Sequence, residues 1–361
     1  ESGKSIKEKF RSLKFFGKGK LFKQDIHHFF PCHIMPLLPE NVPWKNTLLD
    51  MVEEQLKQEN YKNAFEYVEC PKEEPGLFLL NNYCRREKRS TYRYGISYAE
   101  FLGKCQDIVL NDRYIWVHDI PQDRCEEWLD FVTEYNKNVK DKTPAIFILE
   151  VHGFYGRSPK GIQKLVFDQA ITAYDRFAFC ALAASDSNTC REYLRPYLAE
   201  LVSTVCRDDI ELCAACIQKG VRFLKDPKNT LKQIISTEYR SDGERYSYLR
   251  LDDLRSLIWE TQLKAVFPVI EQYRSYFIKK YSSYIQKALP LSNPNGQDIT
   301  SPEDVEIGML VYLVGNGNIT LADSSEYPEL ERFRDARNNL AHLNILKSED
   351  VEMILKRAET L

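Results

Sequence analysis

Residues 3 to 5 of the chain have the types and spacing to bind a phosphate group. Gly3, Lys4 and Ser5 stand directly before a segment, ending near residue 16, that is predicted to form a basic helix. In such an arrangement backbone amides cradle phosphates, the lysine reaches the terminal oxygens, and the serine hydroxyl coordinates Mg²⁺. The apolar strand and the first glycine that complete this arrangement would lie ahead of residue 1. Gly3, Lys4 and Ser5 are therefore candidate nucleotide-binding residues, and Ser5 is a candidate Mg²⁺ ligand.

Two acidic residues lie at the ends of apolar segments farther along the chain. Asp119 ends the segment RYIWVHDI, and Glu150 lies in a second, almost wholly apolar segment over residues 145–151. Between them, residues 122–138 have apolar side chains at i, i+3, i+4 and i+7, which predicts an amphipathic helix. Two apolar strands joined by a helix are typical of a parallel sheet that is buried on both faces. We therefore expect two adjacent parallel strands within residues 113–151.

These features together resemble P-loop NTPases of the AAA+ and STAND types over roughly residues 1–240. The resemblance implies an α/β domain with a parallel sheet that binds ATP and Mg²⁺. In it Ser5 and Asp119 would hold the metal, and Glu150 would take the place of the polar sensor residue. No second acid adjoins Asp119, so the resemblance implies binding more than hydrolysis. The alternative is a generic α/β domain in which Asp119 merely ends a strand.

A second set of polar residues lies in a helical segment near the end of the sequence. Cleaving RNA without a metal needs a base for the 2′-hydroxyl and a cation for the developing phosphorane charge, and His342 and Arg337 could supply them. On a continuous helix these two side chains point roughly 140° apart, so two chains would have to meet to form one site. The alternative is structural: Asn338 and His342 are four positions apart and could hydrogen-bond each other.

The sequence Arg337-Asn338-Asn339-Leu340-Ala341-His342 resembles the signature of HEPN domains, and the resemblance covers about residues 250–361. It implies a small helical bundle in which Arg337, Asn338 and His342 are catalytic, and in which a dimer acts as a metal-independent ribonuclease. Pairings of an ATPase-like module with a HEPN-like module resemble prokaryotic antiphage and conflict systems. That last step is an analogy at the level of folds.

Composition limits the class of protein. The chain has 361 residues, with 50 Lys and Arg against 53 Asp and Glu, a formal charge of −3. This balance excludes a strongly basic nucleic-acid coat. Mean hydropathy is −0.45, and no apolar run approaches the roughly 18–20 residues that cross a bilayer. We therefore expect a soluble, cytoplasmic protein without a membrane partner.

Cysteine and histidine residues give a weaker signal. The ten cysteines are expected to be reduced and mostly buried. Cys213 and Cys216 form a single C-x-x-C pair in a helical segment, and without a second ligand pair this favours core packing over a zinc or redox site. Cys32 and His33 are predicted to lie in a strand or loop for the same reason.

The order of predicted elements defines three parts. A strand is predicted near residues 28–38 and a helix from Trp44 to about Val68, and from residue 162 the chain is predicted to be almost wholly helical, with a break at Pro268. The expected fold is an α/β domain followed by a helical lid and a HEPN-like helical bundle. Their predicted ranges are 1–161, 162–249 and 250–361. The last three helices are predicted over 302–314, 326–342 and 348–359.

Two functions from different classes remain open at this stage. The first is a nucleotide-dependent regulator or sensor that controls a HEPN-like effector and binds ATP, RNA and a second copy of itself. The second is a non-enzymatic, ATPase-like scaffold whose helical end mediates dimerisation or docks a partner. A weaker third hypothesis is a nucleic-acid adaptor that uses the basic segment Arg85–Arg93.

Overall fold

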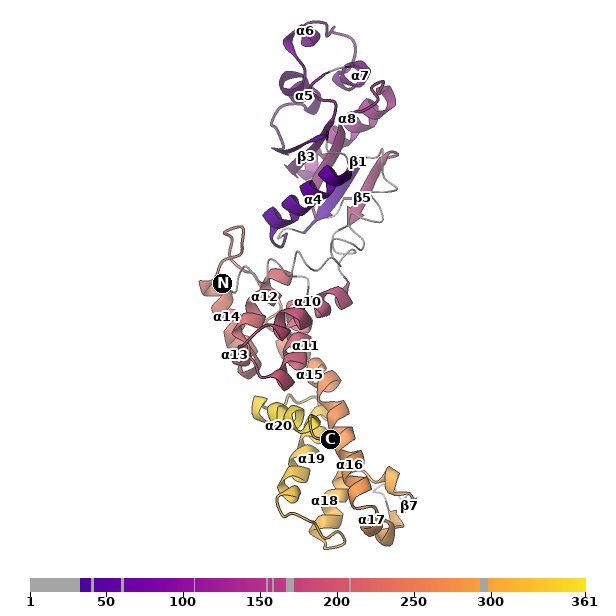
Figure 1. Ribbon diagram of the computed structural model, residues 1–361, viewed down its shortest axis with the longest axis vertical. Helices are drawn as coiled ribbons and strands as arrows, with labels where there is room; N and C mark the ends of the chain where they lie inside the picture. The colour runs from indigo at the N-terminus through magenta and orange to yellow at the C-terminus, as the bar shows by residue number, and fades with distance from the viewer. Residues whose placement is uncertain are drawn as a thin grey trace. The chain divides into compact units, whose positions relative to one another are not determined.

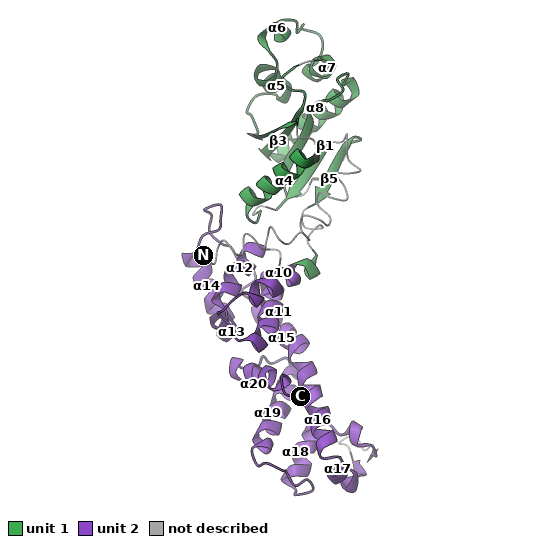
Figure 2. Ribbon diagram, viewed as in Figure 1, with its two compact units in different colours: residues 1–175 green, residues 176–361 purple. Residues whose placement is uncertain are grey.

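The computed structural model describes most of the chain beyond residue 32 (Figure 1). The described ranges are 33–39, 42–59, 62–106, 108–153, 155–157, 159–166, 172–207, 209–292 and 298–361. The chain divides into two compact units, residues 1–175 and 176–361 (Figure 2). Gly3, Lys4 and Ser5 lie outside the described residues, and the division into three parts at residues 161 and 249 stays a prediction.

A five-stranded parallel sheet forms the centre of the first unit. Its strand order is β2-β3-β4-β1-β5, and every pairing is parallel. The predicted neighbours, β3 and β4, pair directly, with Trp116 opposite Ile148. The strands are β1 (His33–Leu38), β2 (Ala64–Glu69), β3 (Arg113–Ile120), β4 (Ile146–His152) and β5 (Ile162–Val166). The α/β prediction and the parallel pairing within residues 113–151 are therefore confirmed.

Helices cover both faces of this sheet, which explains why its central strands are mostly apolar. On one face, Val52 and Leu56 of α4 (Lys45–Glu59) pack against Trp116 and Ile148. On the other face, Trp128 belongs to a larger cluster contributed by three further helices. The three helices are α5 (Pro75–Tyr83), α7 (Tyr98–Lys104) and α8 (Cys125–Asn138). Each fully buried large apolar side chain stabilises the fold by about 1.5–3 kcal/mol.

The two edge strands differ from the sequence-based expectation. The helix predicted from Trp44 to Val68 ends at Glu59, and Ala64–Glu69 forms β2. The prediction of helix from residue 162 is wrong at its start, because Ile162–Val166 forms β5, which pairs with β1 so that Ile162 lies opposite His33. Both segments are short and only partly buried, so their side chains carry little periodic signal. Their extended form comes from pairing with a central strand, which local periodicity does not report.

The connections leave β1 and β4 in opposite directions. From β1 the chain crosses through α4 to β2 at one edge, whereas from β4 it passes β1 to reach β5 at the other edge. The pair β1–β4 is therefore a topological switch point. In open parallel sheets, ligands bind outside the carboxyl ends of the strands at such a point.

The second unit is helical. The predicted break near Pro268 is confirmed, since α15 ends at Ala265 and α16 begins at Phe267. Tyr273 of α16 stacks on Phe333 of α19 with ring centroids 3.8 Å apart, and both side chains are fully buried. The helices are α10 (Ala173–Ser185), which spans the boundary between units, and α11 (Arg195–Cys206), α12 (Ile210–Lys219), α13 (Val221–Lys225), α14 (Pro227–Thr237), α15 (Leu254–Ala265), α16 (Phe267–Lys280), α17 (Ser282–Ala288), α18 (Ile307–Gly315), α19 (Glu326–Ala341) and α20 (Ser348–Ala358). Residues 291–292 and 298–299 form a small antiparallel ladder, β6–β7.

The described cysteines are free thiols, and all but Cys70 and Cys105 are buried. Cys213 and Cys216 both lie fully buried on α12, and the Sγ atoms of Cys206 and Cys216 are 3.6 Å apart. His33 is also a core residue. It is 4% exposed, its Nδ1 accepts a hydrogen bond from the Phe147 amide at 3.0 Å, and burial lowers its pKa to about 4. Among the described helices, none combines the length and apolar character of a bilayer-spanning segment.

Candidate functional site

Asp119 occupies an irregular position at the carboxyl end of β3. The pairing register with β4 shifts between Val117 and Ile120, and Asp119 has a φ of 55°, in the left-handed region. In a regular strand, successive side chains would point to opposite faces of the sheet. A bulge redirects a side chain, and here it brings the Asp119 carboxylate within 3.4 Å of His152 on β4. His118 fixes the other carboxylate oxygen, with its Nδ1 2.6 Å from Oδ2.

Glu150 lies on β4 at the centre of the cluster and is fully buried. Trp116 donates its Nε1–H to Oε2 at 2.8 Å. On the other oxygen, Oε1, His152 Nε2 and Lys45 Nζ both lie 3.0 Å away. Removing a carboxylate from water carries a penalty of several kcal/mol unless charges and hydrogen bonds compensate it. Glu150 has two cationic neighbours and a neutral donor to offset that penalty.

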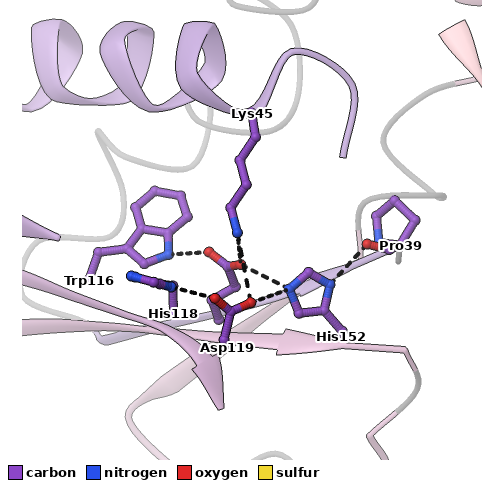
Figure 3. A network of polar contacts seen from close by, with 7 residues as sticks. Pro39, Lys45, Trp116, His118, Asp119 and His152 are labelled. Atoms are coloured by element: carbon purple, nitrogen blue, oxygen red, sulfur yellow. Dashed lines mark hydrogen bonds and ion pairs between the residues drawn. The ribbon is translucent and has the colours of Figure 1, made fainter. Parts of the chain in front are cut away.

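Lys45 is the first residue of α4 and reaches down to the sheet edge (Figure 3). Its ammonium contacts Glu150 at 3.0 Å and Asp119 Oδ1 at 3.9 Å, and its side chain is 27% exposed. The preceding residue, Trp44, is buried and has a φ of 44°, again in the left-handed region. Strained non-glycine residues cluster at ligand sites, because only the surrounding structure can hold them there. Trp44 and Asp119 are two such residues on the two sides of this cluster.

His152 is oriented by the backbone of the segment that follows β1. Its Nδ1 lies 3.0 Å from the carbonyl oxygen of Pro39 (Figure 3). A carbonyl oxygen only accepts hydrogen bonds, so Nδ1 carries a hydrogen and donates it to Pro39. The other ring nitrogen, Nε2, therefore faces both Glu150 Oε1 and Asp119 Oδ1.

The electrostatics favour ionised groups throughout the cluster. Burial alone would raise the pKa of Glu150, but the hydrogen bond from His152 and the charge of Lys45 outweigh it and lower that pKa. The hydrogen bond to Glu150 raises the pKa of His152 against the opposing effect of burial. For Asp119, burial is likewise outweighed by the His118 hydrogen bond and by Lys45, and the pKa is lowered. The cluster thus pairs two carboxylates, whose pKa values are lowered, with the Lys45 ammonium and with His152, whose pKa is raised.

This arrangement has the donors that two kinds of ligand require. Asp119, Glu150 and His152 each offer one ligand atom, and these atoms lie within 4.8 Å of one another. Carboxylate oxygens suit Mg²⁺, and a lysine at the start of a helix suits a phosphate group. The described residues therefore fit a nucleotide with its metal ion at the carboxyl edge of the sheet.

Sequence reasoning found part of this cluster. It selected Asp119 and Glu150, which the structure brings together, but it missed Lys45, Trp116 and His152. Lys45 could have been found from the order of features in the sequence. An apolar segment, prolines and then a lysine at the start of a helical pattern follow one another over residues 33–45. Nothing in the described residues tests the roles predicted for Gly3, Lys4 and Ser5.

The second predicted set, Arg337, Asn338 and His342, lies at the end of α19 on the surface of the second unit. Arg337 Nη2 lies 3.4 Å from Glu306 and its Nη1 lies 3.4 Å from Asn338 Oδ1, while the His342 side chain is exposed beyond the last helical residue. Among the described residues, no side-chain hydrogen bond joins His342 to Asn338 or to Arg337. Leu330, Phe333, Ala336 and Leu340 form the buried stripe of α19, whereas Leu343 is 64% exposed because the helix has ended and its φ is 60°.

The first unit is thus an α/β domain: a parallel sheet with helices on both faces and acidic residues near the carboxyl ends of two central strands. A search of solved structures matches the ORC2 protein of Aeropyrum pernix in its ADPNP–ADP complexes, at 10% identity. The match covers 99% of this chain and 94% of that chain, with a TM-score of 0.27, which does not by itself establish a shared fold. No protein-family model and no curated protein matches the chain.

Proposed function

We propose that the first unit binds ATP with Mg²⁺ at the carboxyl edge of its sheet, and that the protein is a nucleotide-dependent regulator. The observation that carries this proposal is the position of Lys45. This lysine opens the helix that follows β1, lies at the switch point between β1 and β4, and points its ammonium at the acidic ends of β3 and β4. Ligands of parallel α/β domains bind at that place.

The roles of the individual residues follow from their contacts. Lys45 would turn from Glu150 to the terminal phosphates, and Asp119, whose side chain is 54% exposed, would hold Mg²⁺ through water. Glu150 is fully buried and already engaged by Trp116, His152 and Lys45, so it positions these groups and does not activate water. The proposal is therefore one of binding and regulation, with slow hydrolysis at most. Gly3, Lys4 and Ser5 are proposed to add phosphate and Mg²⁺ contacts.

Titration of fluorescent ATP in the presence of Mg²⁺ tests this proposal with the full chain. Charge-assisted hydrogen bonds contribute about 1.5–3 kcal/mol, so Lys45→Met is expected to weaken binding about 10- to 100-fold. Lys45→Arg, which keeps the charge, should retain part of the affinity. Lys104→Met is the matched control, because Lys104 is a surface lysine that pairs with Glu100 on α7. Equal affinity in Lys45→Met and wild type contradicts the proposal, and Lys4→Met measures the contribution of the N-terminal segment.

A second candidate function belongs to the helical unit and is metal-independent RNA cleavage between two copies of the chain. The position of Arg337 and His342 at the end of α19 supports it, since the Arg337 side chain is 34% exposed and His342 is exposed, so that a second chain can reach both. RNA cleavage in EDTA by wild type and its loss in His342→Ala would support it. ATP binding without any RNA cleavage would favour the scaffold function instead.

A further inference from the structure

We propose that Asp119, Glu150 and His152 form a site that binds one divalent transition-metal ion directly. The site lies at the same sheet edge as the proposed nucleotide site, but it uses three side chains as ligands and does not depend on nucleotide. Each residue offers one donor atom, and the three donors lie within 4.8 Å of one another.

The remaining polar atom of each ligand is held by a group outside the triad. His118 Nδ1 lies 2.6 Å from Asp119 Oδ2, and Trp116 Nε1 donates to Glu150 Oε2 at 2.8 Å. The Pro39 carbonyl accepts from His152 Nδ1 at 3.0 Å. The atoms left to face one another are therefore Asp119 Oδ1, Glu150 Oε1 and His152 Nε2. Metal ligands in proteins are oriented in this way, each by a hydrogen bond to its second polar atom.

The distances from the imidazole nitrogen to the two carboxylate donors match those between coordinated ligands. Two atoms bound at about 2.1 Å to one ion, at octahedral or tetrahedral angles, lie about 3.0–3.4 Å apart. His152 Nε2 is 3.0 Å from Glu150 Oε1 and 3.4 Å from Asp119 Oδ1. The nitrogen is thus already at the spacing from each carboxylate oxygen that one ion imposes, and all three donors lie within 4.8 Å of one another.

A positive charge already lies beside the two carboxylate donors. The Lys45 ammonium lies 3.0 Å from Glu150 Oε1 and 3.9 Å from Asp119 Oδ1. On binding, the metal ion forms bonds to Oδ1, Oε1 and Nε2, any proton on Nε2 passes to solvent, and the ammonium moves aside. Two carboxylates and one imidazole suit Zn²⁺, Mn²⁺, Fe²⁺ or Co²⁺, whereas an all-oxygen set suits Mg²⁺ or Ca²⁺.

Titration of Co²⁺ into the metal-free full chain, without nucleotide, tests the site. Co²⁺ bound to nitrogen and oxygen ligands absorbs visible light, and we expect one equivalent to produce saturable bands that Zn²⁺ removes by competition. Asp119→Asn, Glu150→Gln and His152→Gln should each abolish the bands. Trp116→Phe removes only the donor that orients Glu150, and is expected to weaken binding about 10- to 100-fold.

Two variants separate this proposal from its alternatives. Asp130→Asn removes an exposed carboxylate on α8 that pairs with Arg157, and it should bind Co²⁺ as wild type does. Lys45→Met removes the competing ammonium and should tighten Co²⁺ binding while it weakens ATP binding. Metal binding in a chain that does not bind ATP would support the metal site and refute the nucleotide site.

Three results would overturn the metal site: absence of saturable Co²⁺ and Zn²⁺ binding, wild-type binding in Glu150→Gln or His152→Gln, or weaker Co²⁺ binding in Lys45→Met. Circular dichroism of each variant shows whether it has folded. The Trp116→Phe result remains informative if Glu150→Gln fails to fold, because it leaves every proposed ligand in place.

Discussion

Each unit buries a glutamate, and the two carboxylates are held in different ways. Glu150 of the first unit contacts Lys45 and His152, and these in turn contact Asp119, whose side chain is 54% exposed. Glu211 of the second unit is 3% exposed and contacts the Arg240 guanidinium at 3.1 Å and the Ser241 amide at 2.8 Å.

The guanidinium in the second unit is itself buried. The Arg240 side chain is 1% exposed, and it also donates to Asp209 at 2.6 Å. Asp209 in turn accepts from the Leu212 amide as the cap of α12. This triad joins α12 to the segment after α14, and its most exposed side chain, Asp209, is 21% exposed, whereas the cluster around Glu150 extends to Asp119, which is 54% exposed. Burial of a glutamate is therefore not by itself a sign of a site. What distinguishes the first cluster is that its cations lie beside an accessible anion.

The largest expected effect is a loss of stability when the buried ion pair of the second unit is broken. Arg240→Met leaves Asp209 and Glu211 without their cation, and breaking a buried ion pair in this way costs about 3–5 kcal/mol. Thermal melting of the full chain should show the loss, and hydrogen exchange should place it at α12 and at the segment after α14.

The matching control for Arg240 is an arginine on the surface of the first unit. Arg157 is 42% exposed and pairs with Glu126 and Asp130, so Arg157→Met is expected to change stability by about 0–1 kcal/mol. The double variant Arg240→Met, Glu211→Leu should recover part of the loss, because an apolar pair replaces an unpaired charge. Equal stability of Arg240→Met and wild type would remove the distinction between the two buried glutamates.

An intermediate effect on stability is expected from pH, and its sign differs between the carboxylates of the two units. Glu150 and Asp119 have lowered pKa values, so their stabilisation is complete above the ordinary carboxylate values and is lost as pH falls through the lowered ones. His152 has a raised pKa, so its stabilisation is complete below pH 6.5 and is lost as pH rises through the raised value.

Asp209 shows the opposite behaviour to the carboxylates Glu150 and Asp119, because burial raises its pKa despite Arg240. Its contribution to stability therefore increases as pH falls through the raised value toward 3.8. Melting temperature against pH for wild type, His152→Gln and Asp209→Asn checks these signs. His152→Gln should remove the fall in melting temperature on the alkaline side. Asp209→Asn should remove the rise in melting temperature on the acidic side. The same profile in all three proteins would contradict both assignments.

The smallest expected effect on stability is at His342. This side chain is exposed at the end of α19, and surface substitutions are usually within about 0.5 kcal/mol, so His342→Ala should melt as wild type does. Leu340→Ala, two positions earlier and fully buried, should lose about 2–5 kcal/mol. A large loss in His342→Ala would assign this residue to the fold and leave the RNA-cleavage function without support.

The predictions from sequence succeed where one element carries its own pattern. The apolar runs of β3 and β4, the amphipathic helix α8 and the break at Pro268 are visible in short windows, because burial of one face repeats with the period of the element. Asp119 and Glu150 could be selected for the same reason, since each interrupts an apolar run near its end. The edge strands β2 and β5 were missed because their pairing partners lie elsewhere in the chain.

What the sequence determined by itself is therefore the type of most elements, the α/β and helical character of the two units, and two acidic residues of the candidate site. Only the tertiary structure decided the rest. It placed β1 between β4 and β5, bent β3 at Asp119, and brought Lys45 to Glu150 across more than a hundred positions of sequence. The physical reason is that a strand's neighbours, a bulge and an ion pair depend on contacts between distant segments. The periodicity of a single segment reports only which of its faces is buried.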